Sequence, residues 1–482
     1  TVSTDYDICD RLYFEELTLE RVLDICEKES PVGVIVSMGG QIPNNMAATL
    51  SDAGVAVRGT SPVDINRAEN RHVFSRLLDE LGIAQPPWKE LTDIEEVEEF
   101  AERIGYPVLI RPSFVLSGAA MSVALNRDEL ADYLEKASDV NRDHPVVITK
   151  FMTGAKEIDI DAVGMEGELY CYAISEHVEN AGVHSGDATL VLPPQRTYLE
   201  TMRKIKTIAR KIARALNITG PFNIQFLAVN NDVSVIECNL RASRSFQFVS
   251  KVFRMNFIDL ATRLIMGERL PGIDRSSFDL DYVGVKAPQF SFTRLKGSDP
   301  VLDVEMTSTG EVACLGDDFN EAFLKSLLSV GFRIPERSVL VSAGPIDTKA
   351  YMLGSVKVFA DAGLKLYATR GTAEFLEKNG IEAEILRWPL SKKKPGAIEY
   401  IAAGKIDLVI NIPKNNDPDE LDNDYLIRRA AVDFDVPLIT NRQLAKRFAE
   451  TPVSYTHLRA HETSSMISYA VFCLKRGGGG GG

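Results

Sequence analysis

The apolar and polar positions of the chain form their clearest pattern around residues 222–241, where they predict a β-hairpin. Two apolar stretches, Phe222–Val229 and Val233–Glu237, flank Asn230-Asn231-Asp232, a strong turn signal. A three-residue loop places Gln225 directly across from Glu237, whereas a two-residue loop shifts the pairing by one position. The register of this hairpin is therefore open at the level of sequence.

The polar residues near this hairpin indicate a candidate metal site. Side chains alternate between the faces of a strand, so Glu237, Asn239 and Arg241 leave on one side if the chain stays extended. Together with Gln225, they gather amide and carboxylate oxygens beside an arginine. Such oxygens suit Mg²⁺ or Mn²⁺ bound with substrate phosphates. A hairpin with a polar, solvated end explains the residues equally well.

The rest of residues 1–332 alternates between helical and strand patterns. The predicted strand Val108–Ile110 is followed by Arg111 and a loop of small residues. This pattern is typical of a flap whose backbone N–H groups cover phosphates, with the arginine supplying charge. A plain surface hairpin is the alternative. Glu157–Val163 alternates acidic and apolar residues, which in isolation indicates a half-solvated strand; a strand that contacts ribose or adenine is the alternative. The predicted helices are Phe14–Glu27, Asp64–Leu81, Ile94–Ile104, Tyr198–Leu216 and Phe248–Met266, and further strands are Val32–Met38, Met121–Leu125 and Val146–Lys150.

Residues 174–188 combine two of the chain's histidines with glycine and serine in a polar loop. Packing gives little reason for the composition of Gly182–Asp187, so the loop is a candidate binding segment. A lone histidine, however, is more often structural than functional.

Beyond 333–338 the pattern predicts a small doubly wound parallel α/β domain, because short strands and helices alternate. Ligands of such sheets bind at the carboxyl ends of the strands, where Thr369, Thr372, Trp388 and Asn411 lie. From about Thr451 the register breaks and six glycines end the chain. We expect residues 451–482 to be a non-native tail.

Composition narrows the class of protein. The 482 residues are 45% hydrophobic and 25% charged, typical of a globular protein with several domains. A net charge of −14 argues against binding of nucleic acid or an acidic membrane. Six scattered cysteines without a CxxC pair indicate a reducing compartment. We expect no membrane span and no signal peptide, and, because the pattern is under way at Thr1, a piece of a longer protein.

Five segments together resemble carbamoyl-phosphate synthetase, specifically the C-terminal half of its large component in a eukaryotic-like version. They are RPSFVLSGAAM at 111–121, ISEHVENAGVHSGDAT at 174–189, FNIQF at 222–226, VIECNLRASRSF at 235–246 and EMTSTGEVACLG at 305–316. The resemblance covers about residues 3–450. It implies the end of a pre-ATP-grasp domain at 1–61, an ATP-grasp catalytic domain at 62–332 and a methylglyoxal-synthase-like regulatory domain at 333–450.

The resemblance implies the reaction of carbamate with MgATP to give carbamoyl phosphate and ADP. Its cofactors are ATP and two Mg²⁺ or Mn²⁺, with K⁺ a candidate further cation. It also implies a role for each matching residue. The ATP phosphates are contacted by Arg71, Arg111, Ser117 and Gly118, and adenine and ribose are surrounded by Lys150, Met152 and Glu157 and closed off by Gly182, Val183, His184 and Ser185. The metals are bound by Gln225, Glu237 and Asn239. Carbamate and the transferred phosphoryl group are acted on by Arg241 and Arg244, with Asn239.

Some positions depart from the bacterial pattern of the family. Ser117 stands for a glycine, Ala119 for an arginine, Thr149-Lys150 for an Asp-His pair and Leu240 for a proline. Most of these occur in the eukaryotic-like branch, so they leave the implied reaction in place. These departures affect the implied contacts on the adenine side of the nucleotide.

The regulatory domain implies a small-molecule effector. Thr369, Thr372, Trp388 and Asn411 resemble the N-acetylglutamate pattern, but Lys414 stands where that pattern has an asparagine, and a nucleotide effector is the alternative. The implied partners are the missing N-terminal half and a glutaminase or ammonia source. The implied compartment is the cytoplasm or the mitochondrial matrix. The competing hypotheses are another ATP-grasp carboxylate–amine ligase and a nucleotide-binding regulatory module that is inactive without the missing half.

Overall fold

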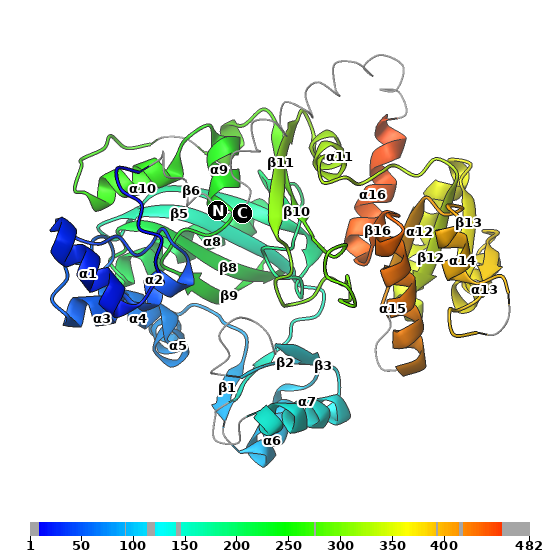
Figure 1. Cartoon of the computed structure of the whole chain (residues 1–482), viewed down its shortest axis with the longest axis horizontal. Coiled ribbons are helices and arrows are strands. Elements are labelled where there is room, and N and C mark those ends of the chain that lie inside the picture. The colour runs from blue at the N-terminus through cyan, green and yellow to red at the C-terminus, as the bar shows by residue number, and fades with distance from the viewer. Residues whose placement is uncertain are drawn as a thin grey trace. The chain divides into compact units, whose positions relative to one another are not determined.

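The computed structural model describes residues 9–91, 93–112, 121–140, 146–273, 276–391, 394–413 and 418–455 (Figure 1). The chain divides into two units, one of residues 1–182 and 190–283 and one of residues 183–189 and 284–482. The predicted boundaries at 61/62 and 332/333 stay predictions.

The first unit contains two antiparallel sheets. The smaller sheet has the strand order β1-β4-β2-β3. In the larger sheet, the strands of this unit lie side by side in the order β7-β6-β5-β8-β9. The strands are β1 Trp88–Leu91, β2 Val108–Pro112, β3 Ser122–Ala124, β4 Val146–Lys150, β5 Lys156–Met165, β6 Glu168–Asn180, β7 Leu190–Leu192, β8 Gly220–Val229 and β9 Asp232–Asn239.

The helices of the first unit confirm most of the predicted helical segments. The helices are α1 Leu19–Glu29, α2 Gln41–Asn45, α3 Ala47–Asp52, α4 Pro62–Glu69, α5 Arg71–Glu80, α6 Ile94–Ile104, α7 Arg127–Val140, α8 Leu199–Ala215, α9 Phe246–Phe253 and α10 Phe257–Ile265. The predicted strand Val32–Met38 is wrong, because only Val34 forms an isolated bridge, with Val57.

Two predicted long helices are each broken into two. The segment Asp64–Leu81 breaks at Asn70, whose backbone is extended. The Asn70 side chain caps α5 by accepting a hydrogen bond from the Val73 N–H. The segment Phe248–Met266 breaks where Arg254 adopts the left-handed conformation and Asn256 caps α10. The first break places Arg71 at the start of α5.

The core of the first unit lies on one face of the larger sheet. Ile158 and Ile160 of β5 and Ile224 and Phe226 of β8 are fully buried there in one cluster with residues of α8 such as Ile205. The opposite face of the same strands carries polar side chains. The expectation of a half-solvated strand at 157–163 is wrong, since Asp159 and Asp161 on that face are 2% and 0% exposed.

The second unit contains a short pair of strands and a parallel sheet. β10 Val283–Gln289 neighbours β11 Gly310–Gly316, and five parallel strands follow in the order β14-β13-β12-β15-β16. The remaining elements are β12 Ser338–Ala343, β13 Lys365–Thr369, β14 Glu384–Leu386, β15 Leu408–Ile412 and β16 Leu438–Ile439, with α11 Phe319–Ser329, α12 Ile346–Asp361, α13 Arg370–Lys378, α14 Ala397–Ala402, α15 Pro418–Asp433 and α16 Arg442–Tyr455.

The five-stranded sheet confirms the predicted doubly wound parallel domain. All its pairings are parallel, and the direction of the strand order reverses at β12, where ligands of such folds bind. The last helix, α16, continues to Tyr455, and Thr451 within it is fully buried. The register break therefore falls later than the sequence indicates, and the rest of the predicted tail lies outside the described residues.

Candidate functional site

A β-bulge decides which way the candidate metal ligands of β9 point. The turn contains only Asn230 and Asn231, because Val229 pairs with Asp232, yet Gln225 still pairs with Glu237. The register shifts between Gln225 and Phe226, where Ile236 is the extra residue of β9. The bulge thus restores the pairing that a two-residue turn alone would have displaced.

The same bulge reverses the alternation of faces along β9. Before it, Val233 and Val235 face the core; after it, Cys238 and Leu240 do so. Without the bulge Glu237 would share the parity of Val235 and point into the core. With it, Glu237, Asn239 and Arg241 leave on the polar face, as predicted.

The predicted metal ligands lie together and fit a divalent cation. Gln225 pairs with Glu237 across β8 and β9, and all three predicted ligands are half-buried. The Asn239 amide donates to one Glu237 carboxylate oxygen at 2.8 Å, so these two side chains are in direct contact. A carboxylate with two amide oxygens is a donor set that Mg²⁺ and Mn²⁺ accept.

Arg241 is held in place by residues of α2 and α4. Its Nε donates to Gln41 Oε1 at 2.8 Å, and its Nη2 lies 3.4 Å from Asn239 Oδ1. Gln41 in turn donates to Glu69 at 2.8 Å. Burial raises the pKa of Glu69, although the Gln41 bond and the charge of Arg241 act against this. Gln41 and Glu69 were missed as site residues; Gln41 follows a Gly-Gly pair, which is too weak a signal on its own.

Arg71 supports the bulge and lies near a second arginine. Its Nη1 donates to the carbonyl of the bulged Ile236 at 2.6 Å, and its guanidinium lies 5.2 Å from the Trp88 ring centroid. Burial and the charge of Arg111 lower the pKa of Arg71. Among the described residues its buried Nε has no hydrogen-bond partner. Two neighbouring arginines with donors to spare fit a phosphate group.

A buried ionisable cluster lies on the same polar face. One ligand atom each from Glu157, Asp159 and His177 fall within 4.8 Å of one another, and His177 Nε2 lies 3.4 Å from Asp159 without a hydrogen bond. Burial raises the pKa of Glu157 to about 7, against the opposing charge of His177. Burial lowers the pKa of His177, but Asp159 and Glu157 outweigh it and the net shift is upward.

Three further residues that are predicted to contact the nucleotide, Lys150, Met152 and Gly182, lie in the first unit. The Lys150 ammonium donates to the carbonyls of Gly105 and Tyr106 at 2.8 and 2.9 Å, so it stabilises a turn. Met152 is half-buried in the next loop. Gly182 has φ +114°, where a Cβ would lie 3.0 Å from the Phe151 ring. Ser117 and Gly118 of the flap lie outside the described residues.

The remaining predicted loop residues, Val183, His184 and Ser185, belong to the second unit. The His184 N–H donates to Asp303 O at 2.9 Å, and the buried Lys286 donates to the carbonyls of Ser185 and Gly186. The buried Asp187 accepts from the N–H groups of Thr307 and Ser308. The loop is therefore held in one conformation by buried charged residues, among which Lys286 gave no sequence signal.

The predicted effector residues of the second unit meet at the carboxyl ends of β12, β13 and β15. Thr369 Oγ1 donates to Ser342 Oγ at 3.2 Å, and Thr372 Oγ1 accepts from the Ala343 N–H. Asp424 accepts from Ser342 and from Asn411 at 3.1 and 2.9 Å.

The network continues from Asn411 into α15. Arg428 Nη1 donates to Asn411 Oδ1 at 2.8 Å, and its other nitrogens pair with Asp299 at 2.7 and 2.5 Å. Trp388 is half-buried just after β14, and Lys414 lies outside the described residues. Asp424 and Arg428 were missed, because in the sequence they look like ordinary surface charges at the end of a polar loop and in the segment that follows it.

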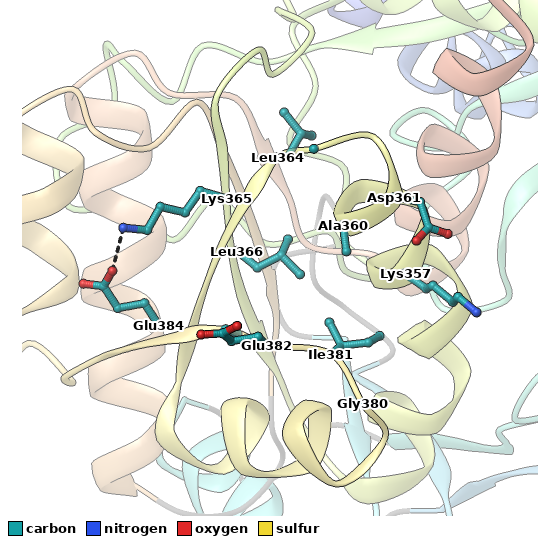
Figure 2. A pocket seen from close by; sticks show the side chains of 12 residues that line it. Lys357, Ala360, Asp361, Leu364, Lys365, Leu366, Gly380, Ile381, Glu382 and Glu384 are labelled. Atoms are coloured by element: carbon teal, nitrogen blue, oxygen red, sulfur yellow. Dashed lines mark ion pairs between the residues drawn. The ribbon is translucent and has the colours of Figure 1, made fainter.

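The second unit also has a surface cavity of about 700 Å³, which lies away from these residues. Figure 2 shows it between the end of α12 and the first residues of β13 and β14, with Lys365 paired to Glu384 at its rim. This is the amino edge of the sheet, whereas the effector residues occupy the carboxyl edge. The cavity is therefore not the site that the sequence predicts.

No helix in the part of the chain that the structure describes has the length and apolar character needed to cross a membrane.

Comparison with known proteins supports the class that fold and site define. Family models match three consecutive segments: "Carbamoyl phosphate synthase preATP-grasp domain" at 1–67, "Carbamoyl-phosphate synthase L chain, ATP binding domain" at 70–273 and "MGS-like domain" at 351–440. Biotin carboxylase of Campylobacter jejuni is similar in fold, with a TM-score of 0.51 and 17% identity over 64% of this chain and 76% of that one.

Curated relatives match nearly the whole chain. It is 53% identical to the multifunctional protein pyrABCN of Emericella nidulans over 98% of its length, and 51% identical to URA2 of Saccharomyces cerevisiae over 98%. It is 51% identical over 93% to the mitochondrial carbamoyl-phosphate synthase [ammonia] of Homo sapiens. The chain spans only 21%, 22% and 30% of these relatives.

Fold and site thus define an ATP-grasp protein with an appended MGS-like domain. Among proteins of that class, the chain belongs to the carbamoyl-phosphate synthase large-chain family.

Proposed function

We propose that the chain catalyses phosphorylation of carbamate by ATP, the second half-reaction of carbamoyl-phosphate synthesis. A carbamate oxygen attacks the γ-phosphorus, the bond from that phosphorus to the β,γ-bridging oxygen breaks, and ADP leaves. The observation that carries the proposal is the set of Gln225, Glu237 and Asn239 oxygens, which the bulge of β9 turns onto one polar face beside Arg241.

Phosphoryl transfer demands positioning and neutralisation of charge rather than a covalent nucleophile. Two Mg²⁺ or Mn²⁺ held by Gln225, Glu237 and Asn239 would supply charge neutralisation at the β- and γ-phosphates. Arg71 and Arg111 bind phosphate oxygens, and Glu157 accepts from the ribose. Arg241, fixed by Gln41, binds the carbamate and stabilises the charge that develops on the transferred group.

The whole reaction of the family requires more chain than this. The relatives are three to five times longer, and we infer that the missing N-terminal half makes carbamate with nitrogen from a glutaminase or from ammonia. The relatives include mitochondrial proteins by name. The proposed compartment is the cytoplasm or the mitochondrial matrix.

The proposed effector site comprises Thr369, Thr372, Trp388 and Asn411, with Lys414. Its matching residues favour N-acetylglutamate over a nucleotide. The test is calorimetric titration with N-acetylglutamate and with UTP. Binding of UTP without binding of N-acetylglutamate would refute the assignment.

The catalytic proposal is tested in the reverse direction, which needs no missing half. The chain is incubated with ADP, Mg²⁺ and carbamoyl phosphate, and ATP is measured, with carbamoyl phosphate omitted as the control. ATP formation that depends on carbamoyl phosphate is the expected result. ADP binding without ATP formation would indicate a regulatory module, and ATP consumption with bicarbonate and another amine would indicate a different ligase.

A further inference from the structure

The segment Leu240–Ser245 joins β9 to α9 and carries both arginines proposed to act on carbamate. Arg241 is held by Gln41, and the Ala242 N–H donates to the carbonyl of Ser37 at 2.8 Å. Arg244 lies in a turn with its side chain exposed. The two residues beside it help to fix the backbone from which this side chain extends.

Both neighbours of Arg244 bond to one buried carboxylate. Ser243 Oγ donates to Asp161 Oδ1 at 2.6 Å, and Ser245 Oγ donates to Asp161 Oδ2 at 2.7 Å. Asn223 of β8, which pairs with Asp161 of β5, donates to Oδ1 at 2.9 Å. One rigid strand of the sheet is thus joined to the turn on each side of Arg244.

The donors and acceptors of this group agree with an ionised Asp161. Each serine hydroxyl has one proton, and both protons go to the carboxylate. The two serine oxygens lie 2.9 Å apart, an approach that follows from their shared acceptor. Hydrogen bonds to a charged acceptor are the stronger kind, so three donors to a carboxylate that is 0% exposed make a stiff connection.

The position of Ser245 indicates that the arrangement does more than stabilise the helix. Ser245 is the N-cap of α9, where a serine side chain ordinarily accepts from the helix's own first N–H groups. Here it makes no such bond, and its backbone is already helical with φ −69° and ψ −11°. The hydroxyl goes to Asp161 instead, and the helix forgoes its cap.

We propose that Asp161 is a positioning residue that acts through Ser243 and Ser245 to hold Arg244 where the transferred phosphoryl group and carbamate bind. The proposal rests on the function proposed above and on the role at carbamate that the family resemblance implies for Arg244. Asp161 itself lies beneath the turn and touches neither reactant. The residues it joins come from strand β5 and from the turn that follows β9, so the sheet fixes the arginine.

The first experiment separates positioning from folding by steady-state kinetics of ATP formation. The Ser243→Ala/Ser245→Ala variant keeps Asp161 and loses both connections. We expect kcat/KM for carbamoyl phosphate to fall at least about tenfold, because a displacement of about 1 Å at a reacting group costs up to a hundredfold. The KM for ADP should stay within about twofold of wild type, since that ligand is bound elsewhere. The exposed Ser51 of α3 provides the control variant, Ser51→Ala.

The second experiment uses no activity. Hydrogen exchange of a peptide spanning 240–246 should be at least about tenfold faster in Asp161→Ala than in wild type, while peptides of β9 stay protected. Asp161→Asn should restore most of the protection, because its amide can accept from one serine and donate to the other.

The outcomes are distinguishable from failure of the proposed function. Unchanged exchange at 240–246 in Asp161→Ala overturns the proposal whether or not wild type makes ATP. Faster exchange with unchanged kinetics also overturns it, because the turn would then be irrelevant to the reaction. A wild-type chain that makes no ATP contradicts the proposed function, and exchange alone then decides whether Asp161 fixes the turn.

Discussion

The polar face of β5, β8 and β9 and the carboxyl edge of β12, β13 and β15 are built from similar residues but differ in how far their charges are satisfied. At the first, burial raises the pKa of Glu157 to about 7. Among the described residues, Asp159 Oδ1 and both nitrogens of His177 lack hydrogen-bond partners. At the second, Asp424, Asn411 and Arg428 satisfy one another in an unbroken network.

The difference teaches what each region needs from a ligand. Buried acidic groups without partners carry an electrostatic cost that a bound cation would reduce. The second is complete in itself, and a ligand there must replace existing hydrogen bonds. That is the behaviour expected of an effector site, where binding changes the protein rather than completing it.

The largest expected effect comes from the first region. Arg241→Ala should reduce kcat/KM for carbamoyl phosphate about a hundredfold or more, because a preorganised charge on the transferred group is lost. The exposed Arg263, paired with Glu268, provides the control Arg263→Ala, which should behave like wild type. Equal activity in both variants would remove Arg241 from the site.

A smaller effect is expected from opening the second region. Asp424→Ala leaves the Ser342 hydroxyl and the Asn411 amide buried without their acceptor, at a cost of about 2–3 kcal/mol in the free energy of unfolding. Denaturant unfolding without ligand measures it. Asp422 is exposed, so the control variant Asp422→Ala should change the free energy of unfolding little. An equal loss of stability in both variants would contradict a network whose hydrogen bonds are all satisfied internally.

The pH dependence of stability should differ between the regions. The folded state holds the Glu157 proton up to about pH 7, whereas the unfolded chain loses it near the ordinary value of 4.5. Unfolding releases a proton between these values, so stability falls as pH rises, by up to about 1.4 kcal/mol per pH unit.

Unfolding at pH 5 and pH 7 tests this, with Glu157→Gln as the matched neutral variant. The variant should lose that part of the slope. His177, whose pKa is also raised, contributes with the same sign at higher pH. A wild-type slope that Glu157→Gln leaves unchanged would place the titrating group elsewhere.

The smallest effect is expected at the surface cavity of the second unit. The Lys365–Glu384 pair at its rim is exposed, so Glu384→Gln should leave the thermal midpoint unchanged, as exposed ion pairs contribute little. It should also leave effector binding unchanged in calorimetry. A lost effector response would move the effector site to the amino edge of the sheet.

Much of the fold could be predicted from periodicity, whereas the register of the site could not. The helix Ile94–Ile104 and the parallel domain agree with the prediction because apolar spacing determines them. The bulge at Ile236 left only an indirect signal: strict alternation from Val233 and Val235 would have buried Glu237. A carboxylate at an expected core position indicates that the alternation of faces along the strand is interrupted. The position of the interruption, however, depends on Arg71, which is distant in sequence.

The polar face was harder to predict for a related reason. Asp159 and Asp161 alternate with apolar residues as they would in a solvated strand, and nothing in that pattern shows that both faces are covered. Likewise, the bonds from Ser243 and Ser245 to Asp161 span more than 80 positions. Such contacts follow from tertiary structure and leave no local trace.

The central claim is that the bulge presents Glu237 as a metal ligand for phosphoryl transfer. The most direct test measures ATP formation from ADP, Mg²⁺ and carbamoyl phosphate by the wild-type chain and by Glu237→Gln, with exposed Glu268→Gln as control. The account predicts ATP from wild type and from the control, and a loss of about a thousandfold or more in Glu237→Gln. Near-wild-type activity in Glu237→Gln would contradict it.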